Sequence, residues 1–311
     1  MESCLLSDFR AIVIGGGGML GGEVVEGLKA AGFQVEAPPK SVADITNRES
    51  MRSLLGRAKA PGLVINCAGY TAVDKAESEQ EAAFALNRDG PGMLADECRE
   101  RGLHLIHIST DYIFNGRAER PYREDDPADP LSIYGRSKWE GEEAVRSRLP
   151  AHIVVRTSWL YGARGTNFVK TMLRLAGERE ELRVVSDQHG CPTWTRDLAG
   201  CLVRIADRIF ADPQNVQWGT YHFCCGGVTT WFDFARAIVD AARERGRLKA
   251  VEVIPVSTAS YPTPAARPMW SVLDCRKIRE KFGISPPAWE TGLARMLDEL
   301  WLVQTPCAPA R

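Results

Sequence analysis

The chain has 311 residues, a formal net charge of −1 and a 44% share of hydrophobic residues. This length suits one large or two modest domains, and the near-neutral charge excludes a global field that attracts nucleic acid or an acidic membrane. No run approaches the ~20 apolar residues of a membrane span, and the N-terminal segment has neither a basic start nor a cleavage signal. We therefore expect a cytoplasmic protein. The nine cysteines show no C-x-x-C or Cys/His spacing, so we expect free thiols and no zinc site.

The first half of the chain alternates short β-branched runs with longer amphipathic stretches. We predict strands at 11–15, 33–37, 63–66, 103–109 and 152–158. Helices are expected from near Met19, over 77–101 with a break near Gly90-Pro91-Gly92, and over 134–145. Strands that alternate with helices are typical of parallel βαβ units with helices on both faces of the sheet. The predicted fold class is α/β, with a doubly wound parallel sheet.

The pattern is looser after Tyr161. Helices are predicted over 167–178, 195–210 and 232–242, strands over 183–187 and 251–255, and a proline-rich segment follows at 261–268. We find no internal repeat. These elements predict a second, smaller α/β unit.

A glycine-rich turn directly follows the first predicted strand. Gly15, Gly18 and Gly21 have the spacing G-x-x-G-x-x-G. Glycines here allow a tight turn and a close approach of the backbone to a pyrophosphate, while the following helix N-terminus supplies amide groups for the phosphates. Such a triplet is common in structural turns, but its place between a strand and a helix favours dinucleotide binding.

The sequence leaves the choice of dinucleotide open between two signals. Glu36 lies about twenty residues beyond the glycines, where an acid binds the ribose 2′-hydroxyl and favours NADH. Lys40 and Ser41 follow in the next loop, where they could meet the 2′-phosphate of NADPH. We expect NADPH, with NADH kept as an alternative.

A tyrosine and a lysine in Y-G-R-S-K form the candidate reducing centre. Tyr134 and Lys138 are four residues apart, so they share one face of the predicted helix. A free phenol has a pKa of ~10, and a nearby ammonium lowers that pKa and makes the phenol a better acid–base group. Thr110, in the S-T-D that ends the fourth strand, can hydrogen-bond the same carbonyl oxygen.

A lone Y-x-x-x-K most often belongs to an ordinary solvated helix face. Here it follows the glycine turn, N-C-A-G at 66–69 and S-T-D at 109–111, in that order. The small residues Cys67, Ala68 and Gly69 would let the chain pass close to the cofactor. These four elements in this order, three of them at strand ends and the fourth on a helix, favour a reductase of the short-chain type.

Several segments carry a resemblance to a known family. They are NCAGYTAVDKAESE (66–79), HISTDYIFNG (107–116), PYREDDPADPLSIYGRSKWEGE (121–142), RTSWLYG (156–162), NFVKTML (167–173) and YPTPAARP (261–268). The chain resembles the extended short-chain dehydrogenase/reductases and, within them, the dTDP-4-dehydrorhamnose reductase family. The resemblance implies NAD(P)H-dependent reduction of the 4-keto group of dTDP-4-dehydro-β-L-rhamnose to dTDP-L-rhamnose, a precursor of cell-surface polysaccharide. It suggests a homodimer as the oligomer.

The resemblance also implies a division of the chain. A Rossmann-type dinucleotide-binding domain would comprise 1–165 and 186–216, and a C-terminal substrate-binding lobe 166–185 and 217–311. The lobe would hold a dTDP-sugar over the nicotinamide.

Site residues carry over position by position. Thr110, Tyr134 and Lys138 would be catalytic, with Tyr134 and Lys138 also touching the cofactor. The remaining cofactor contacts would come from the glycine turn, the adenine region and the end of the third strand: Gly18, Met19, Leu20, Asp44, Ile45, Ala68, Gly69, Tyr70 and Thr71. Asp111 and Trp159 match substrate-contacting positions. Arg267 either pairs with the diphosphate or is an ordinary surface arginine.

Some family members bind magnesium through glutamates near a subunit interface. Glu23 matches one such position, but Arg196 stands where another glutamate is expected. We therefore predict no metal.

Three other functions compete with this interpretation. A nucleotide-sugar dehydratase or epimerase has the same fold, but dehydratases carry Asp-Glu after the strand-end threonine, whereas Tyr112 follows Asp111 here. A reductase of another nucleotide 4-keto-6-deoxysugar is a second alternative. The third is a non-catalytic regulatory subunit like that of methionine adenosyltransferase, which resembles the same reductases.

Overall fold

A six-stranded parallel sheet forms the centre of the larger part of the protein. The computed structural model describes residues 10–58, 62–248 and 251–302. The sheet order is β10-β5-β4-β3-β1-β2. Its strands are β1 (Arg10–Ile14), β2 (Gln34–Glu36), β3 (Gly62–Asn66), β4 (His104–Thr110), β5 (His152–Thr157) and β10 (Gly219–His222). All pairs are parallel. The predicted doubly wound α/β fold is confirmed.

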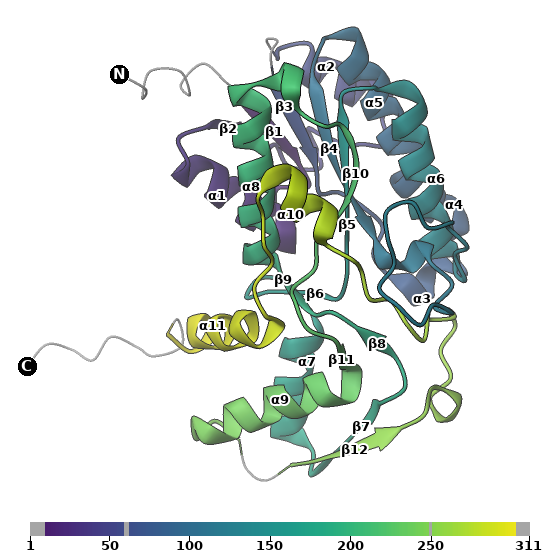
Figure 1. Ribbon diagram of the computed structural model, residues 1–311, viewed down its shortest axis with the longest axis vertical. Coiled ribbons are helices and arrows are strands. Elements are labelled where there is room, and N and C mark those ends of the chain that lie inside the picture. The colour runs from purple at the N-terminus through teal and green to yellow at the C-terminus, as the bar shows by residue number, and fades with distance from the viewer. Residues whose placement is uncertain (1–9, 59–61, 249–250, 303–311) are drawn as a thin grey trace, which may run out of the picture.

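Helices cover both faces of this sheet (Figure 1). One face carries α1 (Met19–Ala30) and α8 (Thr195–Ala211), and the other carries α2 (Arg48–Leu55), α5 (Gly90–Glu100) and α6 (Ile133–Arg148). Successive side chains of a strand point to opposite faces. Val13 therefore packs with the α1 and α8 side, while Ile12 and Ile14 pack with the other. Burial on both faces explains why these strands are apolar throughout rather than alternating.

The long helical stretch predicted over 77–101 is divided differently from the prediction. It consists of α4 (Gln80–Phe84), a wide π-helical turn at Ala85–Asp89 and α5, and it is preceded by the short α3 (Val73–Ala76). The irregularity lies before Gly90 and not at 90–92. Pro91 has no N–H to donate to the carbonyl of Asn87, and a widened turn accommodates this missing bond. The helix α2 was not predicted.

The smaller lobe has its own apolar core. It is built from α7 (Phe168–Glu178), β7 (Glu181–Val185) paired in parallel with β12 (Glu252–Val256), α9 (Trp231–Glu244) and α11 (Trp289–Leu302). Met172, Leu182, Phe234 and Met296 are buried together there. Two small ribbons lie between the lobes: β6 (Leu160–Tyr161) with β9 (Thr193–Trp194), and β8 (His189–Gly190) with β11 (Thr229–Thr230).

One strand differs from the predicted division of the chain. The range 217–311 was assigned to the smaller lobe, yet β10 pairs with β5 in the central sheet, and α10 (Arg276–Phe282) packs beside β10. A strand of four residues is too short to show a period in the sequence. Its pairing satisfies backbone groups that β5 would otherwise expose at an edge. Short 3-10 turns at Asp111–Ile113, Pro213–Asn215 and Thr258–Ser260 complete the described elements.

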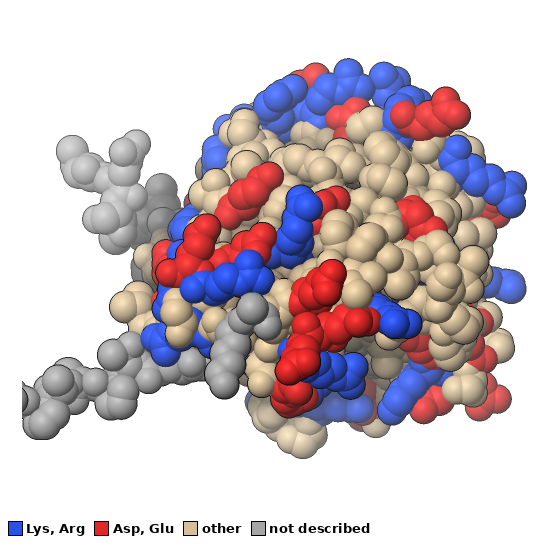
Figure 2. Space-filling view, turned by 90° about the horizontal axis from the view of Figure 1, so that it is seen from below, with Lys and Arg blue, Asp and Glu red and all other residues tan. Residues whose placement is uncertain are grey.

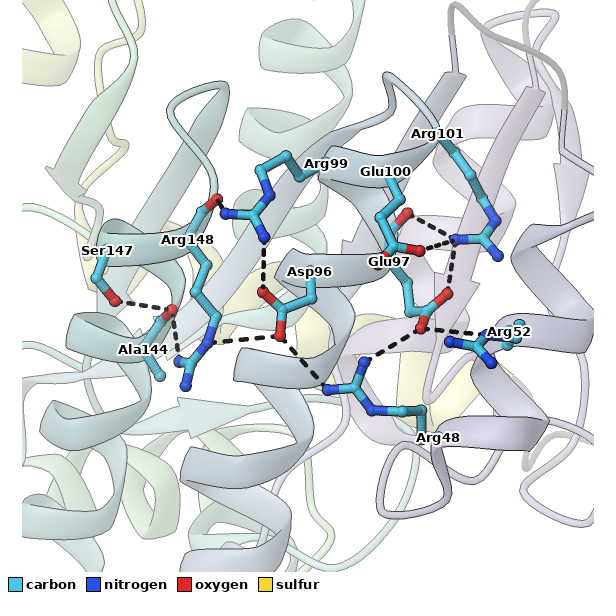
Figure 3. Close-up of polar contacts among 10 residues, drawn as sticks. All are labelled: Arg48, Arg52, Asp96, Glu97, Arg99, Glu100, Arg101, Ala144, Ser147 and Arg148. Carbon is cyan, nitrogen blue, oxygen red and sulfur yellow. Dashed lines mark hydrogen bonds and ion pairs between the residues drawn. The ribbon is translucent and has the colours of Figure 1, made fainter.

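Ion pairs tie the outer helices α2, α5 and α6 together (Figure 3). Glu97 on α5 is fully buried, and Arg101 Nη1 lies 2.6 Å from its carboxylate, with Arg48 and Arg52 close by. Its neighbour Asp96 pairs with arginines of all three helices. Buried charges persist when they are paired in this way.

The surface of the smaller lobe carries mixed charge. Figure 2 shows acidic and basic side chains intermixed at this end of the molecule, separated by uncharged areas. No helix in the described ranges combines the length and the hydropathy needed to cross a membrane. The seven cysteines of the described residues are free, and Cys4 and Cys307 lie outside those residues.

Candidate active site

A cleft of about 870 Å³ opens at the carboxyl ends of β1, β3, β4 and β5. This is where the strand order reverses around β1, the usual place for ligands in open α/β sheets. The cleft is lined by most of the predicted site residues: Gly15, Gly18, Met19, Leu20, Lys40, Asp44, Ile45, Cys67, Ala68, Gly69, Thr71, Thr110, Asp111, Tyr134, Lys138 and Trp159. Gly21, Ser41, Tyr70 and Arg267 are not among its lining residues.

The glycine turn packs directly against the segment that follows β3. Gly15 has φ 78°, a conformation that favours glycine, and a Cβ there would lie 2.8 Å from the backbone nitrogen of Ala68. A Cβ on Gly21 would lie 2.1 Å from the carbonyl oxygen of Gly15. Gly21 therefore lets α1 pack on the turn rather than lining the cleft. Gly18 caps α1 without a side-chain hydrogen bond, which leaves the first amide groups of the helix for an anion.

Hydrogen bonds fix the two segments of the cleft around Asp44 and after β3. Asp44 accepts hydrogen bonds from the backbone and the hydroxyl of Thr46, and these bonds lower the pKa of its carboxyl. After β3, Asn66 accepts from the backbone N–H of Ala68 at 3.0 Å. The N–H of Tyr70 donates to Asn87 at 2.8 Å and its hydroxyl donates to Glu79. Tyr70 is thus held by the α4 region instead of lining the cleft.

Helix α6 carries Tyr134 and Lys138 on one face. The hydroxyl of Ser132 caps it by accepting from the N–H of Gly135 at 3.1 Å, so the helix begins just before Tyr134. Lys138 is 5% exposed, and its Nζ donates to the carbonyl oxygen of Ile108 on β4 at 2.5 Å. Burial lowers the pKa of Lys138 to about 8.

The pKa of Tyr134 moves in the direction opposite to the prediction. Burial raises it to about 12, a hydrogen bond with Thr110 opposes this rise, and the charge of Asp111 adds to it. The expected lowering by Lys138 is therefore wrong, because desolvation of the phenolate dominates and the ammonium is held by a β4 carbonyl. Tyr134 is a phenol at neutral pH, which is the form that can donate a proton.

Unpaired polar atoms meet at the ends of β4 and β5. Thr110 and Thr157 are register partners on these strands, and the Thr110 hydroxyl donates to Asp111 Oδ1 at 3.0 Å. Asp111 Oδ2 and Thr157 Oγ1 are buried without a hydrogen-bond partner. Burial raises the pKa of Asp111 to about 7. Orphaned buried polar atoms cost free energy unless a ligand pairs with them, so both point to ligand binding. Thr157 was not predicted as a site residue, although it lies in the RTSWLYG segment that carries the resemblance.

Aromatic side chains form the wall on the side of the smaller lobe. Trp159, which follows β5, stacks on Trp231 with ring centroids 3.6 Å apart, and Phe168 contacts Trp231 at 4.6 Å. All three line the cleft. Phe168 and Trp231 were not predicted as site residues. Phe168 lies in the NFVKTML segment that carries the resemblance, whereas Trp231 lies in none of those segments.

The guanidinium of Arg267 forms an ion pair with a carboxylate of the same chain. Its Nη1 lies 3.0 Å and its Nη2 2.8 Å from the two carboxylate oxygens of Asp74. This bidentate pair joins the proline-rich segment to the TAVDKAE segment and lowers the pKa of Asp74. Arg267 is not among the residues that line the cleft, and this does not support the predicted contact with the diphosphate.

Tyr112 occupies the position of the dehydratase base. Its ring meets that of Tyr134 edge-on, with centroids 5.8 Å apart. Burial raises its pKa, so it remains protonated and cannot act as a base.

Glu23, which matches a magnesium-binding position of the family, is paired with two arginines. Glu23 contacts Arg164 Nε at 3.4 Å and Arg196 Nε at 3.1 Å, and Arg196 Nη2 lies 2.8 Å from Glu299. A guanidinium between two carboxylates leaves them unsuited to a divalent cation, which prefers oxygen ligands alone. Within the described ranges no group of His, Cys, Asp or Glu is suited to a metal ion.

The glycine turn, the strand-end threonine and the tyrosine–lysine pair on α6 together define a site of the short-chain dehydrogenase/reductase class. A model of the RmlD substrate binding domain family matches residues 9–302. The chain belongs to this family.

Similar proteins cover nearly the whole chain. The spore coat polysaccharide biosynthesis protein SpsK of Bacillus subtilis is 42% identical over 93% of this chain and 97% of its own length. The dTDP-4-dehydrorhamnose reductase of Salmonella typhimurium is 39% identical over 94% of this chain and 99% of its own length. Among solved structures, dTDP-4-dehydrorhamnose reductase from Bacillus anthracis in complex with NADP is 38% identical, with a TM-score of 0.85 over 93% of this chain and 99% of that one.

Proposed function

We propose that this protein is an NADPH-dependent oxidoreductase that reduces the 4-keto group of dTDP-4-dehydro-β-L-rhamnose to give dTDP-L-rhamnose. The observation that carries the proposal is the placement of Tyr134, Lys138 and Thr110 in one cleft with the glycine turn. Several relatives of about 40% identity are dTDP-4-dehydrorhamnose reductases.

The cleft suits a dinucleotide along its sheet side. The uncapped N-terminus of α1 and the glycine turn would hold the pyrophosphate, and Asp44 and Ile45 would border the adenine. Lys40 lines the cleft whereas Glu36 does not, and this supports NADPH over NADH. NADPH, when bound, supplies the hydride for the carbonyl carbon.

The side chains around Tyr134 would manage the proton. The Tyr134 phenol donates its proton to O4 of the sugar, and the hydrogen bond with Thr110 orients the phenol hydroxyl. Neutral pH lies below the pKa of Lys138, which is about 8, so Lys138 is an ammonium that would contact the cofactor. Asp111 and Thr157 offer buried polar atoms without partners, which suit the sugar hydroxyls.

The same proposal assigns one ligand to each lobe. The central sheet with its helices would bind the cofactor, and the smaller lobe would hold the dTDP-sugar over the nicotinamide. The aromatic residues Phe168 and Trp231, which belong to that lobe, support this arrangement by lining the cleft.

A test of the reaction follows NADPH oxidation with dTDP-4-dehydro-β-L-rhamnose and with a panel of other dTDP- and UDP-4-keto sugars. We expect the highest kcat/KM for the rhamnose precursor and for NADPH over NADH. A higher value for a different sugar would establish another 4-keto-6-deoxysugar reductase. Cofactor binding without turnover on any sugar would instead favour the regulatory alternative.

Tyr134→Phe tests the role of the phenol. We expect turnover to fall by at least ~10²-fold, the contribution typical of a positioned general acid. The Kd for NADPH, measured by fluorescence titration, should change little because the ring is retained. Loss of NADPH binding in this variant would show that Tyr134 has been given the wrong role.

A further inference from the structure

Trp159 has an unusual backbone conformation at the edge of the active-site cleft. Its φ is 48°, and it is the only non-glycine residue with a positive φ among the described residues. A bulky residue in the left-handed region costs about 1–3 kcal/mol and persists only where its surroundings impose it. What imposes the conformation here therefore bears on what the residue does.

Two neighbours enclose the indole of Trp159. Its ring lies face to face with Trp231, with centroids 3.6 Å apart and planes 8° apart. Its edge lies against Gly190, where a Cβ would be 2.4 Å from Cε2 of the indole. The carbonyl of Trp159 also accepts from the N–H of Thr193 at 3.2 Å. Ring and backbone are thus held from one segment of the chain, 189–193, and from Trp231.

The same ribbon supplies both neighbours of the indole. Gly190 on β8 pairs with Thr229 on β11, and Trp231 is the first residue of α9, immediately after β11. The hydroxyl of Thr230 caps α9 by accepting from the N–H of Asp233 at 3.0 Å. Because the cap fixes where α9 begins, it also fixes Trp231 relative to Gly190.

The stacking is not one that two free indoles would choose. Aromatic pairs prefer offset or edge-to-face arrangements over a direct sandwich. Trp231 also packs against Phe168, with ring centroids 4.6 Å and planes 52° apart. The packing of the smaller lobe therefore imposes both the face-to-face stacking of the two indoles and the left-handed backbone of Trp159. Backbone strain of this kind is common at ligand sites.

We propose that Trp231 is a positioning residue for the reduction, which acts through Trp159 by pressing its indole against the sugar end of the cleft. The proposal rests on the proposed function. The paired rings add a flat apolar wall to the cleft that Asp111 and Thr157 also line. This combination suits a deoxysugar, which has both apolar C–H groups and hydroxyls. Trp231 thereby makes the reacting end of the cleft depend on the smaller lobe.

The test compares Trp231→Leu, Trp231→Phe and Gly190→Ala with the wild-type protein. Two stacked indoles couple their transitions, so the far-ultraviolet circular dichroism should contain an exciton couplet that Trp231→Leu abolishes. In this variant we expect kcat/KM for the dTDP-sugar to fall about tenfold, equivalent to about 1.4 kcal/mol. The Kd for NADPH should stay unchanged. Trp231→Phe should also lose the couplet but recover most of the kcat/KM, because it restores a flat ring.

Gly190→Ala provides an independent route to the same indole. The new methyl group would displace Trp159 while Trp231 remains, so the couplet should weaken and kcat/KM should fall as in Trp231→Leu. The matched control is Trp218→Phe, whose ring stacks on His104 at the far end of the sheet. It should leave both the couplet and the kinetics unchanged.

The proposal is overturned if Trp231→Leu keeps the wild-type kcat/KM or the wild-type couplet, or if Trp231→Phe is as impaired as Trp231→Leu. A parallel decrease in NADPH binding would also overturn it, because the loss would then be general. If wild-type protein turns over no sugar, the proposed reduction fails separately. In that case, calorimetric titration with dTDP-L-rhamnose tests the role of Trp231. The inference requires Trp231→Leu to bind dTDP-L-rhamnose more weakly than Trp231→Phe does.

Discussion

At the scale of single residues, Asp111 combines deep burial with an incomplete set of hydrogen bonds. It is 2% exposed, and its Oδ2 has no partner. Burial raises its pKa to about 7 from the ordinary value of 3.8. The folded state therefore binds a proton more tightly than the unfolded state, so the contribution of Asp111 to stability is present below pH 4 and is lost as the pH rises through about 7.

We predict that Asp111→Asn raises the Tm relative to the wild-type protein more at pH 8 than at pH 5. We also expect this variant to be impaired in the reduction. About two pH units separate pH 5 from the pKa of about 7, so at about 1.4 kcal/mol per unit the difference between the two pH values is at most about 3 kcal/mol. The measurement is the difference in Tm between variant and wild type at both pH values, with the exposed Asp125→Asn as the surface control. A difference that is the same at pH 5 and pH 8 would show that Asp111 is not held as a buried carboxyl.

The sequence predicted the main residues of this centre but not their ionisation. The order of Thr110, Tyr134 and Lys138 after successive strands was enough to place them in one cleft. The pKa of Tyr134 depends on how deeply α6 is buried and on the partner that Lys138 finds, and neither is encoded in a four-residue spacing. Ser41 was predicted to touch the cofactor from its place in a loop and Tyr70 from the resemblance, and neither lines the cleft.

At the scale of elements, α6 sits unusually close to the π-helical turn at 85–89. A Cβ on Gly141 would lie 1.9 Å from the carbonyl oxygen of Asn87. Asn87 is fully buried, and its side chain donates to Ser137 Oγ at 3.0 Å. The helix that carries Tyr134 and Lys138 thus packs directly on the π-helical turn. This is the turn that accommodates the hydrogen bond missing at Pro91.

We expect Gly141→Ala to destabilise the protein by about 1–3 kcal/mol, as overpacking does, and to lower kcat by moving α6. Thermal unfolding and steady-state kinetics measure the two effects. The matched control is Gly200→Ala within α8, where a Cβ would have no neighbour within 4 Å. This control should be neutral or slightly stabilising, because alanine favours a helix. If Gly141→Ala and Gly200→Ala unfold at the same temperature, α6 does not pack tightly on the turn at 85–89.

At the scale of the whole molecule, one charge cluster joins the two lobes. Arg196 on α8 lies between Glu23 on α1 and Glu299 on α11, and Arg164 from the segment before α7 completes it. Glu23 is 5% exposed, and buried carboxylates of this kind are retained when they are paired. Arg196 pairs with both Glu23 and Glu299.

We predict that neither EDTA nor added MgCl₂ changes the Tm of the wild-type protein. Arg196→Glu should lower the Tm, because Glu23 loses a partner, and should make the Tm rise with added MgCl₂, since a bound ion stabilises the folded state. Arg174→Glu, on the exposed face of α7, is the control for charge reversal. A wild-type Tm that falls in EDTA would contradict this account.

The sheet domain was more predictable from sequence than the second lobe. Continuous apolar runs such as AIVIG and LVIN indicated buried parallel strands, and five of the six strands of the central sheet were predicted. The helices α2, α10 and α11 were missed, and so were the two small ribbons. Ribbons of two residues per strand depend on contacts between distant segments, which carry no local period.

The late position of β10 has a consequence for how the chain is made. The edge of β5 receives its partner only when residues 219–222 are available, long after the other five strands have been synthesised. Until then a nascent chain on the ribosome presents an open parallel edge, the kind of surface on which other chains add strands. The final strand of the sheet therefore also closes the period in which this protein is most exposed to aggregation.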